Sequence, residues 1–596
     1  MAVALVLSWL KVWTPVASFD FIALAATLGG GFPMFREAYE AVRERRMTME
    51  LSMAIAVVAT LLIGQFFTGL IITFFVIFAE LLEHLTVARG RNVIEKLIEL
   101  LPRKATVRRN DNEQEISIDD LRRDDVVIIK PGTRIPVDGV VIKGNSSIDQ
   151  SSITGESLPV EKVEGSEIFA GTMNQAGILE VEARSVSKDT MFGKIIEIIE
   201  QAERSKAPIQ KVADTLSARL VYFAFGGAII TFLVTRDVVS AIAALVVAGA
   251  CGVAAGTPLA ILAGIGRTAK EGIIVKGGVY LELLSKVDTI VLDKTGTLTL
   301  GKPQVIDIQS FNSVSRQEVL RLAASAEQHS EHPLAKAVLE KAKADQINVE
   351  KYSDITYFPG QGIVCKVNGS EILLGNASLV EDRAISLGST VNKYIAERKE
   401  RGETCILVAS HGEVVGAIGI ADTLRGEAQQ AVEEMKQLGC RVILLTGDSW
   451  TVAKTVGETL HVDEVFGEML PEQKLEKIRE LKSNGWSVAM VGDGVNDAPA
   501  LVEATVGIAM GTGTEVALES ADMALMTDNL MKIVKALKIS KQSLRVIMFN
   551  FWGTVIVDAA GMALAFFGIL TPLFAALIHV GSELGFILNS ARLFRR

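Results

Sequence analysis

A heptapeptide at residues 293–299, Asp-Lys-Thr-Gly-Thr-Leu-Thr, constrains the fold of this chain more than any other stretch. It directly follows a short apolar run at 289–292, and such a run predicts a buried parallel strand. Doubly wound sheets bind ligands where their strands end, so Asp293 stands at a ligand-binding position. An aspartate there can attack a phosphoryl group and hold it as an acyl phosphate, while Lys294 balances charge. The heptapeptide therefore predicts phosphoryl transfer on an α/β sheet.

Two later apolar runs end in similar loops of glycine and aspartate, which extends the predicted sheet. Residues 442–445 lead into Thr-Gly-Asp at 446–448, and residues 488–491 lead into Gly-Asp-Gly-Val-Asn-Asp at 492–497. We expect Asp293 and Asp493, at adjacent strand ends, to hold one Mg²⁺ together with Thr295, because Mg²⁺ prefers oxygen ligands. The catalytic residues predicted in this domain are Asp293, Lys294, Thr295, Thr446, Gly447, Asp448, Lys474, Asn496 and Asp497.

Apolar segments precede and follow these motifs. The chain of 596 residues is 49% hydrophobic with a mean hydropathy of +0.35, which is too apolar for an average soluble enzyme. A membrane span needs ~20 apolar residues. Residues 1–16 fall short of that and are either a truncated first helix or a signal-like segment; a membrane helix is favoured because no basic residue precedes Lys11. Seven further spans are predicted at 19–32, twice within 51–82, and at 220–234, 238–262, 545–567 and 571–593.

Charge and cysteine content exclude other classes. The net charge of −10 gives no reason to expect a nucleic-acid partner. The four cysteines are widely separated and never form Cys-x-x-Cys, so neither a disulfide framework nor a zinc knuckle is predicted. Reduced thiols in a cytosolic compartment are therefore expected.

Two soluble segments carry shorter motifs. Residues from about 89 to 219 show alternating apolar runs and turn signals, which predict a small, mostly β domain around Thr-Gly-Glu-Ser at 154–157. Residues 301–416 interrupt the catalytic domain and contain Ser-Glu-His-Pro at 330–333, Gly-Gln-Gly at 360–362 and Gly-Asn at 375–376. Each of these motifs alone is weak, and their order and spacing carry the interpretation.

Together, the heptapeptide, the Thr-Gly-Glu-Ser loop and the His-Pro motif resemble those of the heavy-metal-transporting P-type ATPases over essentially the whole chain. The resemblance implies ATP and Mg²⁺ as cofactors, an aspartyl phosphate on Asp293, and Glu156 as the mobile carboxylate that orients water for its hydrolysis. It also implies a nucleotide site at Glu331, His332, Gly360, Gly362, Gly375 and Asn376. The Thr-Gly-Glu-Ser loop, which resembles the family's actuator loop, and the membrane helices exclude a soluble phosphatase that has the same sheet.

The implied architecture is a bundle of seven to eight transmembrane helices with cytosolic domains. These are a β-rich actuator domain, a doubly wound phosphorylation domain and an α+β nucleotide-binding domain. The expected bounds are membrane helices at 1–88, the actuator at 89–215, a membrane hairpin and connector at 216–284, the phosphorylation domain at 285–300 and 417–540, the nucleotide-binding domain at 301–416, and the last two helices at 541–596.

The membrane residues depart from the family's pattern. The usual Cys-Pro-Cys aligns with Gly-Ala-Cys at 249–251, so the cysteine is kept and the proline that opens the helix is lost; nearby glycines are expected to provide that flexibility. His-Val-Gly-Ser-Glu at 579–583 resembles a motif of the cobalt/iron/zinc branch. Intramembrane ionisable residues are costly and usually functional. The transported ion is therefore expected at Cys251, Asp558, His579 and Glu583.

This ligand set favours a divalent transition metal ion (Zn, Co, Fe, Mn or Ni) over Cu(I), which prefers Cys and Met. The expected function is ATP-driven export from a bacterial or archaeal cell across its plasma membrane. No amino-terminal Cys-x-x-Cys or His-rich segment precedes the first helix. The pump is therefore expected to take its ion directly or from a cytosolic metal carrier. The alternatives are a P-type ATPase for potassium, calcium or protons, and a membrane-tethered metal sensor or uncoupled phosphatase.

Overall fold

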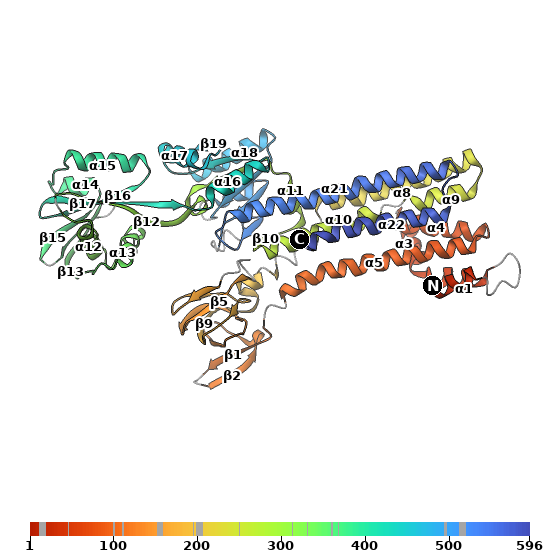
Figure 1. The fold of residues 1–596 in the computed structure, drawn as a ribbon, viewed down its shortest axis with the longest axis horizontal. Coiled ribbons are helices and arrows are strands. Elements are labelled where there is room, and N and C mark those ends of the chain that lie inside the picture. The colour runs from red at the N-terminus through yellow and green to blue at the C-terminus, as the bar shows by residue number, and fades with distance from the viewer. Residues whose placement is uncertain are drawn as a thin grey trace. The chain divides into compact units, whose positions relative to one another are not determined.

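The computed structural model divides the chain into two compact units, residues 1–286 with 535–596, and residues 287–534. Figure 1 shows the long helices that belong to the first unit and the two sheet-containing lobes that belong to the second. The structure describes residues 1–10, 20–45, 47–98, 102–109, 112–151, 159–194, 196–197, 207–248, 251–312, 314–330, 332–358, 361–367, 369–493, 497–511 and 520–595.

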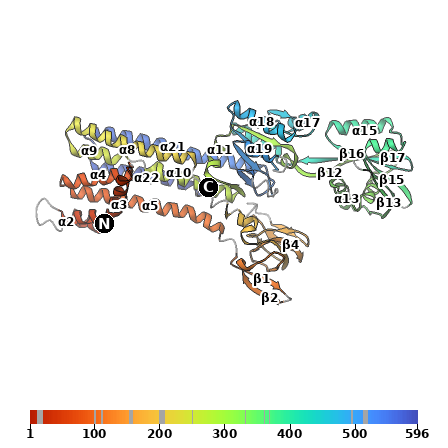
Figure 2. The same ribbon diagram turned by 180° about the vertical axis from the view of Figure 1, so that it is seen from behind.

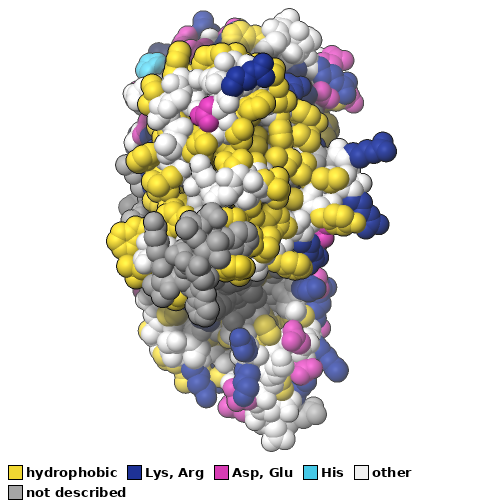
Figure 3. Space-filling view, turned by 90° about the vertical axis from the view of Figure 1, so that its right-hand side faces the viewer, with side chains coloured by type: hydrophobic (Ala, Val, Ile, Leu, Met, Phe, Trp, Pro, Cys, Tyr) yellow, Lys and Arg dark blue, Asp and Glu magenta, His cyan; other side chains and the backbone are white. Residues whose placement is uncertain are grey.

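The apolar segments of the first unit are helical, as the sequence predicts. Within the described residues, three helices are long and apolar enough to cross a membrane, at 208–235, 531–566 and 572–594. Hydrophobic side chains cover much of the surface at the ends of these helices, with few charged ones among them (Figure 3). The helices are α1 (Ala2–Trp9), α2 (Phe21–Gly30), α3 (Phe32–Arg43), α4 (Met49–Leu62), α5 (Phe66–Ile98), α8 (Pro208–Thr235), α9 (Val238–Val247), α10 (Cys251–Lys270), α11 (Gly278–Ser285), α21 (Met531–Phe566) and α22 (Pro572–Ala591).

Several predicted boundaries fall inside continuous helices. The helix α5 runs through the boundary at residue 88 to Ile98, α8 begins at Pro208 before the boundary at 215, and α21 begins at Met531 before the boundary at 540. Hydropathy indicates where a bilayer-type composition ends, whereas a helix continues for as long as its backbone hydrogen bonds do. The domain limits therefore need this correction at their helical joins.

Two further segments differ from the prediction. The membrane span predicted as one helix at 238–262 is divided into two helices. The helix α9 ends at Val247, Ala248 has non-helical backbone angles, and α10 begins at Cys251. Residues 1–16 contain α1, which spans Ala2–Trp9, and the rest of that stretch beyond Leu10 lies outside the described residues. The predicted break between the two spans within 51–82 is present, because α4 ends at Leu62 and α5 begins at Phe66.

The segment predicted to be mostly β forms two small antiparallel sheets. Their strand orders are β2-β1-β3-β9-β4-β7 and β6-β5-β8. Alternate strand residues such as Val107, Val127 and Val181 fill the core, which matches the period-2 pattern of the sequence. The strands are β1 (Lys104–Arg109), β2 (Asn112–Ser117), β3 (Val126–Ile129), β4 (Asp138–Lys143), β5 (Ser146–Asp149), β6 (Val160–Lys162), β7 (Glu167–Ile168), β8 (Met173–Asn174) and β9 (Leu179–Ser185).

The second unit contains the predicted parallel sheet. Within it the strands run in the order β22-β21-β20-β11-β18-β19, and all neighbouring pairs are parallel. The central strands are almost fully buried, as expected for a sheet with helices on both faces. The elements are β11 (Thr289–Asp293), β18 (Arg441–Leu445), β19 (Glu464–Phe466), β20 (Val488–Gly492), β21 (Val506–Ala509), β22 (Met523–Leu525), α16 (Ala428–Gln437), α17 (Trp450–Leu460), α18 (Pro471–Ser483) and α19 (Ala498–Glu503).

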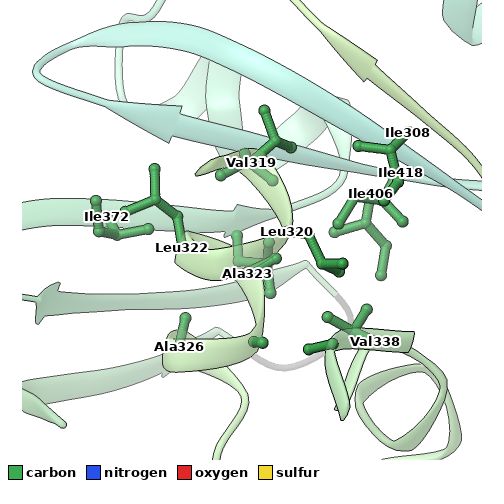
Figure 4. Close-up of a cluster of buried hydrophobic side chains, with 14 of the residues drawn as sticks. Ile308, Val319, Leu320, Leu322, Ala323, Ala326, Val338, Ile372, Ile406 and Ile418 are labelled. Carbon is green, nitrogen blue, oxygen red and sulfur yellow. The ribbon is translucent and has the colours of Figure 1, made fainter. Parts of the chain in front are cut away.

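The inserted lobe is an antiparallel sheet in the order β12-β17-β16-β15-β14-β13. One face packs against α12 and α13, where Val319, Leu320 and Ala323 meet sheet residues such as Ile406 and Ile418 (Figure 4). The other face packs against α14 and α15. Figure 2 shows this lobe from behind. The elements are β12 (Thr299–Ser310), α12 (Arg316–Ala326), α13 (Pro333–Ala344), β13 (Tyr352–Phe358), β14 (Gly362–Val367), β15 (Ser370–Gly375), α14 (Ala377–Asp382), α15 (Ser389–Glu400), β16 (Thr404–Ser410) and β17 (Glu413–Leu424).

Candidate functional site

Two carboxylates and one ammonium group meet at the end of β11. The Lys474 ammonium donates to Asp293 Oδ1 at 2.5 Å and to Asp497 Oδ1 at 2.8 Å. All three side chains are at least nine-tenths buried. Burial, reinforced by Asp497, raises the pKa of Asp293 to about 7 despite the attraction of Lys474. The site therefore holds a buried carboxylate whose charge depends on a single cation.

Parallel register explains why these groups meet. Asp293 is paired with Leu445 of β18, and Leu292 is paired with Val491 of β20, so the three strands end at one edge. The sequence predicted this convergence from the apolar runs and the loops that follow them. Lys474 comes from α18, which begins with Pro471 in its first turn, where the missing N–H of proline costs no hydrogen bond.

The turn after Asp293 approaches Asp493 closely. Gly296 has a φ of +72°, and a Cβ added there would lie 3.2 Å from Asp493 Oδ2. The turn is braced by Arg425, whose guanidinium donates to the carbonyls of Thr297 at 2.8 Å and Gly296 at 2.9 Å. Thr299 Oγ1 donates to Asp422 Oδ2 at 2.5 Å. These bonds hold the turn in place, and Thr295 is exposed at its tip.

A second group of predicted residues surrounds Lys294. Its ammonium forms an ion pair with Asp448. Thr446 is buried, and its hydroxyl donates to Asp448 Oδ2 at 3.0 Å, whereas Gly447 is exposed beside it. The Thr-Gly-Asp loop therefore lies against the Lys294 end of the turn, at the same edge of the sheet as Asp293.

The inserted lobe contains a cavity of about 380 Å³. His332, Gly362, Gly375 and Asn376, all predicted nucleotide residues, line it. His332 is fixed there because its Nδ1 accepts from Leu334 N at 3.3 Å and caps α13. Gly362 and Gly375 are paired across β14 and β15. A Cβ added at Gly362, which has a φ of +150°, would lie 2.5 Å from Gly375 Cα, so larger residues would separate the strands.

Several predicted residues lie outside what the structure describes. Glu156, Glu331, Gly360 and Asn496 fall in undescribed segments, and the side chain of Cys251 is not described. Their assigned roles stay predictions.

The remaining predicted ion ligands are buried in the membrane helices. Asp558 on α21, and His579 and Glu583 on α22, are each at most 4% exposed. Their helices pack around α10: a Cβ added at Gly252 would lie 2.5 Å from the Phe586 ring and 3.2 Å from Thr554 Oγ1. These contacts lie within about one helical turn of the predicted ligands. Within the described residues, no three His, Cys, Asp or Glu side chains form a metal-binding group.

The structure adds residues that the sequence reasoning missed. Glu327 and Tyr357 line the cavity of the inserted lobe, and Arg425 with Asp422 braces the turn after Asp293. Burial raises the pKa of Glu327, against a hydrogen bond from Ser330 and the nearby His332, which lower it. A usable signal for Arg425 was its position just after β17, since a charged residue at the end of an apolar strand often serves a site.

Comparisons with known families agree with this geometry. The family model of the P-type ATPase actuator domain matches residues 99–200, within the β-rich segment. The model of haloacid dehalogenase-like hydrolases matches residues 287–505, which contain the inserted lobe and the strands β11, β18, β19 and β20 of the parallel sheet.

Individual relatives match along most of the chain. A copper-exporting P-type ATPase of Bacillus subtilis is 37% identical over 590 residues, covering 94% of this chain and 73% of the relative. One of Staphylococcus saprophyticus is 38% identical over 540 residues, covering 89% of this chain and 67% of the relative. The crystal structure of a zinc-transporting PIB-type ATPase in its E2·Pi state is 30% identical with a TM-score of 0.64, covering 100% of this chain and 98% of that one.

Proposed function

Because this chain belongs to the heavy-metal-transporting, PIB-type branch of the P-type ATPases, we propose that it uses ATP hydrolysis to export a divalent transition metal ion. Proteins of this family are cation-translocating ATP hydrolases that use ATP and Mg²⁺. The chain is a membrane protein with cytosolic catalytic domains. The ion, the direction of transport and the roles of single residues are the parts that we propose.

The contact of Lys474 with Asp293 and Asp497 carries the catalytic proposal. An Asp293 oxygen attacks the γ-phosphorus of ATP, a new O–P bond forms, and the bond to the bridging oxygen breaks so that ADP leaves. Lys474 offsets the negative charge that accumulates there, and Lys294 with the Thr-Gly-Asp loop at 446–448 receives the phosphate oxygens. Glu156 is assigned to orient the water that later hydrolyses the acyl phosphate, and Asn496 completes the catalytic set.

The oxygen donors beside Gly296 fit Mg²⁺. Asp293 and Asp493 are carboxylates on neighbouring strand ends, and the glycine leaves room for a small ion next to Asp493. We assign Mg²⁺ to Asp293, Thr295 and Asp493. When bound, Mg²⁺ supplies positive charge to the transferring phosphate, and the chain's own carboxylates fix where that charge lies.

The cavity of the inserted lobe fits the adenosine part of ATP. It combines apolar walls from Phe358 and Ile406 with the polar groups of His332 and Asn376, as small-molecule sites commonly do. We assign nucleotide binding to Glu331, His332, Gly360, Gly362, Gly375 and Asn376, and add Glu327 as a hydrogen-bond acceptor for an amino group.

Ligand chemistry favours a divalent ion among the candidates. The relatives named above are copper exporters or a zinc transporter, which keeps Cu⁺ as the second candidate. The proposed ligands Asp558, His579 and Glu583, with Cys251, comprise two carboxylates, one imidazole and one thiol. Cu⁺ selects sets rich in thiolate and thioether, whereas imidazole and carboxylate suit Zn²⁺, Co²⁺, Fe²⁺, Mn²⁺ and Ni²⁺.

ATPase measurements on the purified full chain in lipid vesicles test this proposal. The rate is measured with Zn²⁺, Co²⁺, Fe²⁺, Mn²⁺, Ni²⁺, Cu⁺, K⁺ and Ca²⁺, together with uptake of each ion into inside-out vesicles. Stimulation and uptake with a divalent ion are expected. For a variant of a proposed ion ligand such as Asp558→Asn, the matched carboxylate control is Asp237→Asn, because Asp237 caps α9 at an exposed position. Stimulation by Cu⁺ alone, or by K⁺ or Ca²⁺ alone, would contradict the proposal.

A further inference from the structure

Three membrane helices are joined by a buried network of hydrogen bonds. Asn550 of α21 donates both of its amide hydrogens to α22, because its Nδ2 lies 3.2 Å from the Phe586 carbonyl oxygen and 2.8 Å from Ser590 Oγ. The Ser590 hydroxyl in turn donates to the Gly256 carbonyl of α10 at 2.8 Å. Asn550 Oδ1 accepts from the Asn589 amide at 2.7 Å. We call this set of bonds the clasp.

The clasp stabilises close packing of the three helices. Asn550 and Ser590 are fully buried, and every side-chain donor of these two residues has an acceptor in the clasp. Gly256 permits the contact, since a Cβ added there would lie 3.0 Å from Asn550 Nδ2. An amide or hydroxyl in apolar surroundings is costly when it is unpaired. Separating the helices would leave these donors unpaired, so the clasp favours the closed packing.

The Phe586 ring fills the space between the same helices, directly beside the clasp. A Cβ added at Gly252 of α10 would lie 2.5 Å from Phe586 Cδ2, and one added at Gly553 of α21 would lie 2.6 Å from Phe586 Cε1. The ring therefore lies between two glycines on different helices. Phe586 is three residues after Glu583 on α22, which is less than one helical turn. The ring is thus the next layer of the bundle after a proposed ion ligand.

Basic residues indicate which side of this layer faces the cytosol. Arg267 and Lys270 lie in the last turn of α10, Arg592 follows α22, and α21 begins with a lysine-rich stretch at 531–545. Membrane proteins carry such an excess of basic residues on the cytosolic side. The helix α21 also directly follows the strands of the parallel sheet along the chain. From these ends, each helix reaches its clasp residue before its proposed ion ligand, so the clasp lies on the cytosolic side of the ligands.

We propose that Asn550 is a positioning residue of a cytosolic gate: the clasp holds the Phe586 ring between α10 and α21 and closes the path from the cytosol to the ion ligands. Asn550 donates to the carbonyl of the same residue whose ring fills that space, so breaking the clasp releases the ring. The closed and open arrangements are two states of one equilibrium, which the clasp shifts toward the closed state. That the path leads to an ion site rests on the proposed function, whereas the hold on Phe586 does not.

A thiol placed beyond the clasp measures access from the cytosol without any transported ion. Thr554 is 3% exposed and lies about one turn after Asn550 on α21, toward the ion ligands. The full chain with Thr554→Cys is placed in inside-out vesicles, whose outer face is cytosolic, and is treated with a positively charged methanethiosulfonate that does not cross lipid. Mass spectrometry of the peptide that contains residue 554 gives the modification rate at that position alone.

Two substitutions break the clasp from different helices. Asn550→Leu keeps the branched shape of the side chain without its polar atoms, and it should raise the modification rate about tenfold, the factor expected from the loss of one buried hydrogen bond. Ser590→Ala leaves the bond to the Phe586 carbonyl, so a smaller rise of about threefold is expected. The double variant should exceed Asn550→Leu by no more than about twofold, because both side chains belong to one network.

The matched control is Ser540→Ala on α21, because Ser540 is 1% exposed and its hydroxyl has no hydrogen-bond partner among the described residues. If neither Asn550→Leu nor Ser590→Ala is modified faster than this control, the gate is refuted. It is also refuted if Asn550→Leu leaves the modification rate unchanged but raises the ion concentration for half-maximal ATPase, since Asn550 then binds the ion. If the expected order appears but no divalent ion activates the ATPase, the gate stands and the proposed function fails.

Discussion

The proposed phosphorylation site and the proposed ion site differ in how their buried charged groups are stabilised. At the end of β11, Lys474 binds Asp293 and Asp497 directly, and the geometry is fixed by neighbouring parallel strands. In the membrane helices, Asp558, His579 and Glu583 come from two helices and the described residues form no closed group. The reacting atoms of phosphoryl transfer are always the same, so a rigid site suits them. A transported ion must leave, so its site cannot be equally closed in every state.

The largest expected effect breaks the phosphorylation site. Asp293→Asn should abolish the acid-stable, hydroxylamine-sensitive phosphoenzyme and lower ATPase activity by roughly 10⁴-fold or more, because an amide cannot form an acyl phosphate. Labelling with γ-³²P-ATP measures it. The control is Asp345→Asn, because Asp345 is exposed at the C-terminal end of α13. If the Asp293→Asn protein is still labelled, another residue is the phosphate acceptor.

The second effect concerns turnover of the same intermediate. Glu156→Gln should still accept phosphate from ATP but lose it about 10²- to 10⁴-fold more slowly, since an amide cannot take a proton from the attacking water. A chase with unlabelled ATP after brief labelling gives the decay rate. Decay at the parent rate would remove Glu156 from this role and leave the hydrolytic carboxylate to be found.

The third effect belongs to the membrane region alone. Asp558→Asn should raise the ion concentration for half-maximal ATPase by at least about tenfold, because a neutral amide offsets less of the ion's charge. Phosphorylation by inorganic phosphate should persist, since that reaction uses groups of the parallel sheet. Asp237→Asn again serves as the control. If both reactions fail together, Asp558 supports the fold rather than the ion.

The sequence predicted the structure best where the candidate site residues directly follow the strands that position them. The heptapeptide at 293–299 and the loops at 446–448 and 492–497 each follow an apolar run, so strand ends and site residues were predicted together, and the parallel sheet has this form. The membrane helices were predicted from hydropathy, but α5 continues to Ile98 because helical hydrogen bonding does not stop where apolar composition stops.

Contacts between residues that are far apart along the chain were not predicted from the sequence. Arg425 braces a turn more than 120 residues earlier in the chain, and no local pattern announces that bond. The end of α9 at Val247 is similar, because the helices that pack there, α21 and α22, lie at the other end of the chain. Glycines near Cys251 suggested flexibility, yet the position of the break depends on tertiary packing. Such features follow from which helices meet, and a single sequence does not state that.

The smallest expected effect tests the nucleotide cavity through pH. Because burial raises the pKa of Glu327 above its usual value near 4.5, its carboxylate takes up a proton at a higher pH than an exposed glutamate. The ionised form accepts a hydrogen bond from an amino group, so ATP affinity should be greatest above that pKa. It should fall by about tenfold as pH drops through it, the worth of one charge-assisted bond of ~1.5 kcal/mol.

Equilibrium binding of ATP to the Asp293→Asn protein, between pH 5 and pH 8, measures this effect without turnover. Glu327→Gln should bind ATP more weakly at pH 8 and lose this pH step, because its amide does not titrate. His332 lines the same cavity, so His332→Asn is the matched variant that keeps Glu327 and should keep the Glu327 step. An unchanged pH profile in Glu327→Gln would show that Glu327 lines the cavity without binding the nucleotide.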